Sequence, residues 1–178
     1  MFKKLILSLC LCGLVSATEN FESLSGEISS TAIEYGVLEA DAGHAVIDVG
    51  HGRSGKKALH IKGGKDRVVT LRLKEALATD TPMEFHLQRW TREKPFVFSV
   101  RTGDIELYKN DKIGTGGYNA HPEVIVPAGT ETISFICTAA NKGGALIDDL
   151  TLHTGPMKIE KVDVVEPGDY PLMKNGLY

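Results

Sequence analysis

Short runs of β-branched and aromatic residues recur about every ten residues along most of this chain, separated by Gly, Asp, Asn and Pro. Such runs are typical of strands joined by turns. The sequence therefore predicts eleven strands, at 19–24, 36–41, 44–49, 57–63, 67–73, 83–91, 96–102, 105–109, 122–126, 131–139 and 145–153. The segment 73–80 is predicted to be a loop. Many short strands with Gly-rich turns favour an all-β fold, an antiparallel β-sandwich of the jelly-roll type.

The two ends of the chain depart from this pattern. Residues 1–17 have a basic start, an apolar centre and a small-residue exit, as secretory signal peptides do. Because the apolar run is shorter than the roughly 20 residues that span a bilayer, we expect cleavage after Ala17 and a secreted or periplasmic product without membrane attachment. Residues 18–155 form the predicted domain, and 156–178 a linker or the start of a following domain.

Charge and cysteine content narrow the class of partner. The formal net charge is −3, and loss of Lys3 and Lys4 with the leader would make it −5. A nucleic-acid partner is therefore not expected.

Cys137 is the one cysteine left after cleavage, so we expect no intramolecular disulfide. It lies in the apolar run ISFICTA and is interpreted as a buried core residue. We expect a monomer.

The run MEFHLQRWT at 83–91 has one face suited to sugar binding. Alternation places His86, Gln88 and Trp90 together on that face. Sugar recognition uses a flat aromatic surface for the pyranose ring, with amide or imidazole groups for its hydroxyls. Arg101, in the next run, or Arg92 suits a carboxylated sugar such as sialic acid, because a guanidinium can hold a carboxylate through two bonds. The alternative is that these side chains form an ordinary solvated sheet face.

The Gly-rich segment YKNDKIGTGGYNAHPE offers further candidates for sugar contact. Its polar and aromatic residues Tyr108, Tyr118, Asn119 and His121 would lie at the rim of the sandwich. No Lys-Ser or Lys-Thr follows the glycines and no helix is predicted after them, so a phosphate-binding loop is not expected. An ordinary loop between strands is the alternative.

No catalytic residue is predicted. The six histidines show neither metal-ligand spacing nor a nearby nucleophile elbow. A pair of carboxylates for glycoside hydrolysis cannot be selected, because the separation that matters is spatial.

The last predicted strand, ALIDDLTLHT at 145–154, contains two adjacent acids, although strands normally exclude aspartate. Simple alternation places Asp148 on the same face as Leu146, Leu150 and Leu152. A carboxylate on an apolar face is costly unless a cation or hydrogen-bond donors meet it. The sequence therefore predicts a specific partner for Asp148.

Three stretches, ENFESLSG, SGKKALHIKGG and GGALIDDLTL, resemble the galactose-binding-like jelly roll of secreted carbohydrate-active enzymes. The resemblance covers residues 19–154. It implies that the first and last strands are adjacent and that Glu22 and Asp148 hold a structural calcium ion, together with carbonyls near Gly55 and Lys57. Carboxylates and carbonyls are suitable calcium ligands. The alternative is that the acids accept backbone N–H bonds at a strand bend or pair with a basic side chain.

The tail segment MKIEKVDVVEP resembles the lead-in that precedes the propeller of bacterial exo-sialidases. The resemblance implies the front portion of a secreted sialidase-like glycoside hydrolase. The chain lacks that family's Arg-Ile-Pro triplet and Ser-x-Asp-x-Gly-x-x-Trp repeats, so it is not expected to be catalytic itself. The predicted function is a carbohydrate-binding accessory module for a sialylated or galactose-containing glycan. The alternative is a structural or protein-interaction sandwich.

Overall fold

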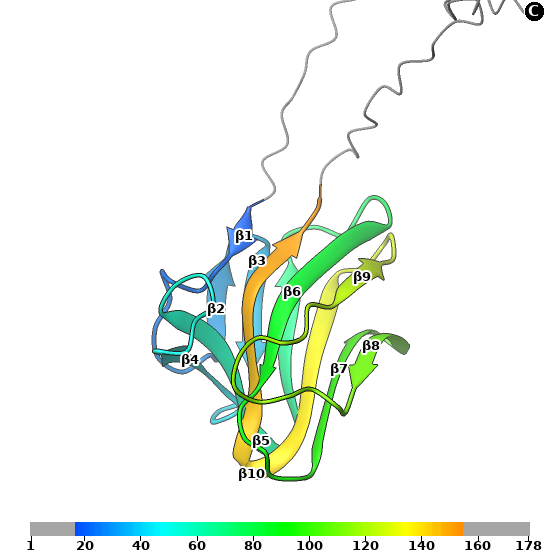
Figure 1. The fold of residues 1–178 in the computed structure, drawn as a ribbon. Coiled ribbons are helices and arrows are strands. Elements are labelled where there is room, and N and C mark those ends of the chain that lie inside the picture. The colour runs from blue at the N-terminus through cyan, green and yellow to red at the C-terminus, as the bar shows by residue number, and fades with distance from the viewer. Residues whose placement is uncertain (1–16, 155–178) are drawn as a thin grey trace, which may run out of the picture.

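The computed structural model describes residues 17–154, and within this range it contains ten strands and no helix. The strands are β1 (Thr18–Glu19), β2 (Ser30–Ile33), β3 (Gly36–Ala40), β4 (Ala45–Val49), β5 (Lys57–Leu73), β6 (Thr81–Arg89), β7 (Phe96–Thr102), β8 (Ile105–Asn110), β9 (Glu123–Val126) and β10 (Thr132–Leu152). Figure 1 shows them closely stacked, with the long strands β5 and β10 running through the molecule.

The strands β5 and β10 are antiparallel partners along most of their length, and both bend between the two layers of the fold. The register shifts on β10 between Cys137 and Gly144, opposite the bend of β5. A Cβ at Gly63 would lie 1.9 Å from the carbonyl oxygen of Ala140, so a larger residue does not fit at this corner. Strands that switch sheets through a bulge in this way are a known means of building a sandwich from one hydrogen-bonded sheet.

Each half of the two long strands belongs to a different layer. In the first layer, β4 pairs with the start of β5, the end of β10 lies beside it, and β6 and β9 follow. The second layer contains, in order, β2, β3, the end of β5, the start of β10, β7 and β8. The pairings within residues 17–154 are antiparallel, which confirms the predicted all-β antiparallel sandwich.

The core lies between the two layers. Phe85 of β6, in the first layer, packs against Phe98 of β7 and Phe135 of β10, in the second, with ring centroids 6.1 and 5.6 Å apart. All three rings are fully buried. Cys137 is buried in the same core, and burial raises the pKa of its thiol to about 12. The interpretation of Cys137 as a core residue is confirmed.

The predicted strands agree with the observed ones except at four places. The strand predicted at 19–24 is wrong over most of its length, because β1 ends at Glu19 and residues 20–24 form a turn. Two predicted pairs, 57–63 with 67–73 and 131–139 with 145–153, are each one continuous strand, β5 and β10. The strand β2, with the sequence STAI, was not predicted. The segment that follows β5 is a loop, as predicted.

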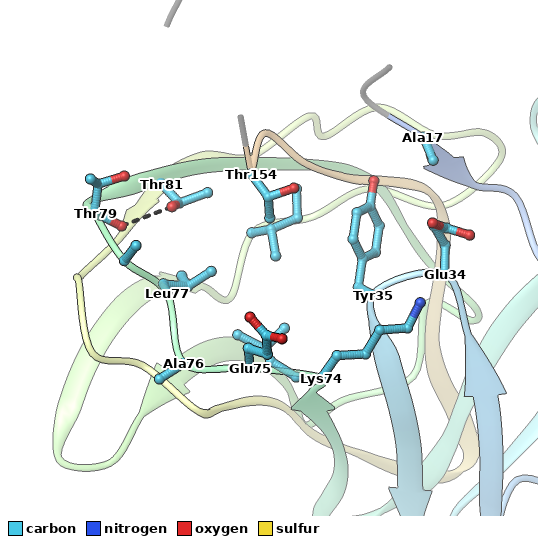
Figure 2. A pocket seen from close by; sticks show the side chains of 13 residues that line it. Ala17, Glu34, Tyr35, Lys74, Glu75, Ala76, Leu77, Thr79, Thr81 and Thr154 are labelled. Atoms are coloured by element: carbon cyan, nitrogen blue, oxygen red, sulfur yellow. Dashed lines mark hydrogen bonds between the residues drawn. The ribbon is translucent and has the colours of Figure 1, made fainter. Parts of the chain in front are cut away.

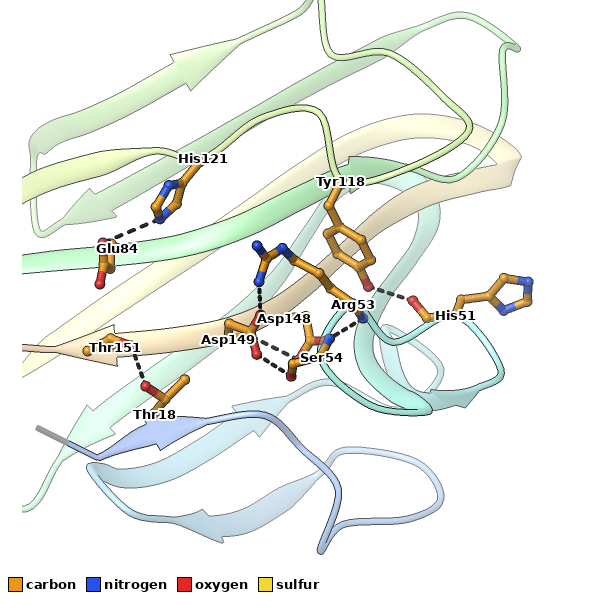
Figure 3. Close-up of polar contacts among 10 residues, drawn as sticks. All are labelled: Thr18, His51, Arg53, Ser54, Glu84, Tyr118, His121, Asp148, Asp149 and Thr151. Atoms are coloured by element: carbon orange, nitrogen blue, oxygen red, sulfur yellow. Dashed lines mark hydrogen bonds and ion pairs between the residues drawn. The ribbon is translucent and has the colours of Figure 1, made fainter.

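The first and last strands lie side by side, as the resemblance implied. Thr18 pairs with Thr151 in the β1–β10 ladder, and their hydroxyl oxygens are 2.9 Å apart (Figure 3). Residues 1–16 of the predicted leader and the whole predicted tail, 156–178, lie outside the described residues. Among residues 17–154, no helix has the length and apolar character needed to cross a membrane.

Candidate functional site

The outer face of the first layer carries the polar side chains that alternation predicted. Along β6, Met83, Phe85 and Leu87 are buried in the core, and the residues between them are half-buried. Glu84, His86 and Gln88 therefore point away from the core. The predicted division of this strand into two faces is confirmed.

Two loops come together over this face. Residues 111–122 run along the edge of β6, where Leu87 exchanges backbone hydrogen bonds of 2.9 and 3.3 Å with Ala120. From this loop the Tyr118 hydroxyl donates a 2.7 Å hydrogen bond to the carbonyl of His51, in the loop between β4 and β5 (Figure 3). Burial raises the pKa of Tyr118, so the phenol stays protonated as a donor. Tyr118 therefore links two loops that are far apart in the sequence.

An aromatic cluster surrounds Trp90 at the end of β6. The His60 ring stacks on the indole with centroids 4.5 Å apart, and the His51 ring meets it edge-on at 4.7 Å. Burial lowers the pKa of His60, which favours the neutral imidazole that stacks well on an aromatic ring. The His51 side chain is 52% exposed and contacts Asp48 through Nδ1. The cluster therefore presents a half-buried indole and an exposed imidazole to solvent.

Further along β6, a second ring pair lies on the same face. His86 stacks on His121 of the loop before β9, with centroids 4.0 Å apart and the rings nearly parallel. Desolvation lowers the pKa of His86, and the nearby His121 and Arg53 lower it further. The pair continues the row of flat rings along the strand.

Asp148 does not lie on the core side of β10, so the predicted face assignment is wrong. A β-bulge interrupts the β10–β6 register between Asp148 and Thr151, and Asp149 has a positive φ of 50°. The extra residue changes which side chains face the core. Ile147 and Leu150 therefore both point inward, while Asp148 lies opposite His86 on the outer face.

The two adjacent acids hold the loop between β4 and β5 (Figure 3). Asp148 is fully buried; its Oδ2 accepts the backbone N–H groups of Arg53 at 2.6 Å and Ser54 at 3.4 Å, and its Oδ1 accepts that of Asp149 at 2.8 Å. Asp149 pairs with the Arg53 guanidinium at 2.7 Å and accepts the Ser54 hydroxyl. Burial raises the pKa of Asp148. The acids thus fix a loop across the sheet face.

Glu22 holds the other end of the same loop. Its Oε1 accepts the backbone N–H groups of Lys56 and Lys57 at 2.7 and 2.6 Å. The Lys57 ammonium donates to the carbonyls of Glu22 and Leu24, each at 2.7 Å. Glu22 and Asp148 therefore contact the same loop.

These contacts do not fit calcium well. Calcium collects six to eight oxygens, but here N–H donors from the loop point at both carboxylates, and the Lys57 ammonium takes two carbonyl oxygens. The arrangement matches the alternative reading, in which the acids accept backbone hydrogen bonds. The calcium ion stays a prediction.

The predicted sugar-contacting residues are only partly brought together. His86, Gln88, Trp90 and Tyr118 lie on or over the outer face of the first layer, and the exposed Asn119 follows Tyr118. The other two candidates lie elsewhere. Arg101 of β7 is exposed on the second layer with Glu106 at 3.5 Å, and the Tyr108 ring packs edge-on against Phe85 of the core at 6.4 Å.

His51, His60 and Arg53 belong to this face but were not predicted. His60 occupies an outward position of β5, opposite Leu146 of β10, which periodicity alone could have indicated. His51 and Arg53 lie in a loop, and their contacts to Trp90 and Asp149 join residues far apart in the chain. No local pattern marks such contacts.

A separate hollow of about 410 Å³ lies at the end of the sandwich where the described residues begin and end (Figure 2). Tyr35, Leu77 and Leu152 line it together with polar groups such as Thr81. Burial raises the pKa of Tyr35. None of the predicted sugar-contacting residues lines this hollow.

The solved structures to which this chain is similar include adhesin domains and carbohydrate-binding modules. The K2 cleaved adhesin domain of Lys-gingipain has a TM-score of 0.54 and 18% identity, with 80% of this chain and 100% of that chain covered. For the K3 cleaved adhesin domain of Lys-gingipain from Porphyromonas gingivalis W83, the TM-score is 0.53 and the identity 12%, over 78% and 98%. For TmCBM61 in complex with β-1,4-galactotriose, the TM-score is 0.48 and the identity 18%, over 77% and 95%.

At these identities the likeness to the two adhesin domains shows a shared fold. No family model matches the sequence, and no curated protein matches it well enough to count as a relative.

Proposed function

We propose that this chain is a non-catalytic glycan-binding module that uses the outer face of its first layer. The observation that carries the proposal is the row of flat rings and hydrogen-bonding groups along β6, from His86 through Gln88 to Trp90, beneath Tyr118 and the exposed His51. Pyranose rings bind to aromatic and imidazole surfaces through their C–H faces, and their hydroxyls bind to amides and imidazoles.

The loop contacts support this proposal because they fix the face before a ligand arrives. Glu22 and Asp148 hold the loop that carries His51, and Tyr118 joins that loop to residues 111–122. A preformed surface loses less conformational entropy on binding.

Isothermal titration against candidate oligosaccharides, selected on a glycan array, tests the proposal. Gln88→Ala and Asn119→Ala remove hydrogen-bonding groups without touching the core, and each is expected to weaken binding about 5- to 20-fold, the equivalent of one or two hydrogen bonds. Trp90→Ala is expected to abolish it. Arg101→Ala, on the other layer, is the matched control and should bind as the unmodified chain does. Equal binding by all four variants would contradict the proposal.

The finer assignment extends this proposal to a sialylated or galactose-containing glycan and to a sialidase-like parent enzyme. Arg92, two residues after Trp90, is exposed and has its Nε 3.3 Å from the Thr115 hydroxyl, where a sugar carboxylate could bind. Comparing sialylated with desialylated forms of one glycan tests this assignment. A preference for the sialylated form that is lost in Arg92→Ala would support the assignment to a sialylated glycan. No hydrolysis of a fluorogenic sialoside is expected from this chain. Export of the chain by its predicted leader belongs to the same proposal.

A second candidate function is protein interaction without glycan binding. It is favoured by the similarity of the fold to two domains that are described as adhesin domains. A glycan array without any ligand, combined with binding to an immobilised glycoprotein that survives removal of its glycans, would favour this candidate over the first.

A further inference from the structure

Three neighbouring strands bring histidine and glutamate side chains together at one end of the same face. Glu84 of β6 lies opposite Glu123 of β9 on one side and Thr151 of β10 on the other. His121 lies two residues before the start of β9, and His153 immediately follows β10. This cluster of Glu84, His121, Glu123 and His153 is separate from the Trp90 cluster and from the loop that Asp148 holds.

The side chains of the cluster converge on the Glu84 carboxylate. His121 Nε2 lies 3.3 Å from Glu84 Oε2, and His153 Nε2 lies 3.3 Å from Glu84 Oε1. One ligand atom each from Glu84, His121 and Glu123 lie within 4.8 Å of one another. Two ligands on a tetrahedral zinc ion with bonds of about 2.0–2.1 Å are about 3.3 Å apart. Small rotations of exposed side chains would close the group around such an ion.

The charges of the cluster favour a cation. Two carboxylates directly opposite each other on neighbouring antiparallel strands repel, which destabilises the pair. His121 can offset one of these charges only when it is protonated. A divalent ion would offset both and leave the imidazole neutral, as a metal ligand must be.

The surroundings hold the ligands in place. The His121 ring stacks on His86 at 4.0 Å, which fixes its plane. Backbone bonds from Leu87 to Ala120 and from Phe85 to Pro122 hold the residues beside it against β6. Preorganised ligands of this kind lose less freedom when an ion binds.

We propose that Glu84, His121 and Glu123 bind a divalent transition-metal ion of the zinc type, with His153 positioning the Glu84 carboxylate. Zinc is bound by imidazole and carboxylate groups, three protein ligands leave one position open to water or a ligand oxygen, and calcium prefers oxygen ligands alone. The site is distinct from the calcium site implied by the resemblance and does not depend on glycan binding.

Titration of zinc chloride into the metal-free full chain at neutral pH tests the proposal. One ion per chain is expected, with a rise in melting temperature. His121→Ala and Glu123→Gln each remove a ligand and should weaken binding at least tenfold, and His153→Ala should weaken it about 10- to 100-fold, as loss of a supporting partner does. Calcium chloride should neither bind at this site nor displace zinc.

The control variant is His44→Gln. His44 lies 4.0 Å from the Asp41 carboxylate, so it also forms a His–carboxylate pair, but in the turn between β3 and β4 and not in the Glu84 cluster. The His44→Gln variant should bind zinc as tightly as the unmodified chain. The absorption of Co²⁺ bound in place of zinc should change in His121→Ala and not in His44→Gln. Zinc binding of equal affinity in His121→Ala, Glu123→Gln and the unmodified chain would overturn the proposal.

Discussion

The loop held by Asp148 and the cluster around Glu84 both bring carboxylates to the outer face of the first layer, but they give those carboxylates different partners. Asp148 is fully buried and accepts three backbone N–H groups. The side chain of Glu84 is 32% exposed, and its neighbours are the imidazoles of His121 and His153 and a second carboxylate.

The difference indicates two roles for acids on one sheet. Backbone N–H donors cannot leave a carboxylate without unfolding the loop that carries them, so Asp148 has a structural role. Imidazoles and exposed carboxylates can rotate and exchange a proton for a metal ion, so Glu84 is free to take part in binding.

The largest expected effect is on folding stability at Asp148. Asp148→Ala leaves two backbone N–H groups of the loop and that of Asp149 in β10 without their acceptor, and should lower the free energy of unfolding by about 2–4 kcal/mol. Glu84→Ala should change it by less than about 0.5 kcal/mol, because the site is partly exposed and loses a repulsive contact. Urea denaturation of both variants measures this contrast. Similar losses in the two would break the distinction between the regions.

A smaller effect is expected at Lys57, which supplies the positive charge at the Glu22 end of the loop. Lys57→Met keeps the aliphatic stem but removes two hydrogen bonds to backbone carbonyls, and urea denaturation should show a free energy of unfolding lower by about 1–2 kcal/mol.

Calcium chloride added to the metal-free unmodified chain should leave its melting temperature unchanged. A rise of several degrees would instead support the calcium ion that the resemblance implied.

The sequence was sufficient for the fold because the signals for it are local. Alternation along 83–91 placed Phe85 in the core and His86 outside it, and both positions are as predicted. Turn residues separated most strands correctly. The prediction was wrong at the two corners, because Gly63 and Gly144 were interpreted as marking strand ends. In the structure, β5 and β10 bend there and continue into the other layer.

The site was predicted less completely because it depends on contacts between distant residues. The bulge after Asp148 reverses the faces of β10. The two aspartates indicate an irregular strand, since Asp tolerates a positive φ better than most residues, but they do not show where the extra residue lies. The connection from β6 to β7 crosses from one layer to the other, which separates Arg101 from Trp90. The Arg53–Asp149 ion pair joins the loop between β4 and β5 to β10, two segments that are far apart in the chain.

The smallest expected effect is the pH dependence that His60, the buried member of the Trp90 cluster, contributes. Burial holds the pKa of His60 below its usual value of about 6.5, so the unfolded chain binds more protons than the folded one when the pH is below that value. The stability contributed by neutral His60 is therefore fully present above about pH 6.5 and is lost as the pH falls through the folded pKa.

Melting temperatures measured between pH 5 and pH 8 should rise with pH in the unmodified chain and rise less in His60→Gln, which keeps a polar side chain at this position but cannot titrate. Asn119→Ala removes no titrating group and should keep the slope of the unmodified chain. The readout is the slope, so a lower melting temperature caused by lost stacking on Trp90 does not affect it. An unchanged slope in His60→Gln would assign the pH dependence to other groups, with His86, whose pKa burial also lowers, as the next to be replaced.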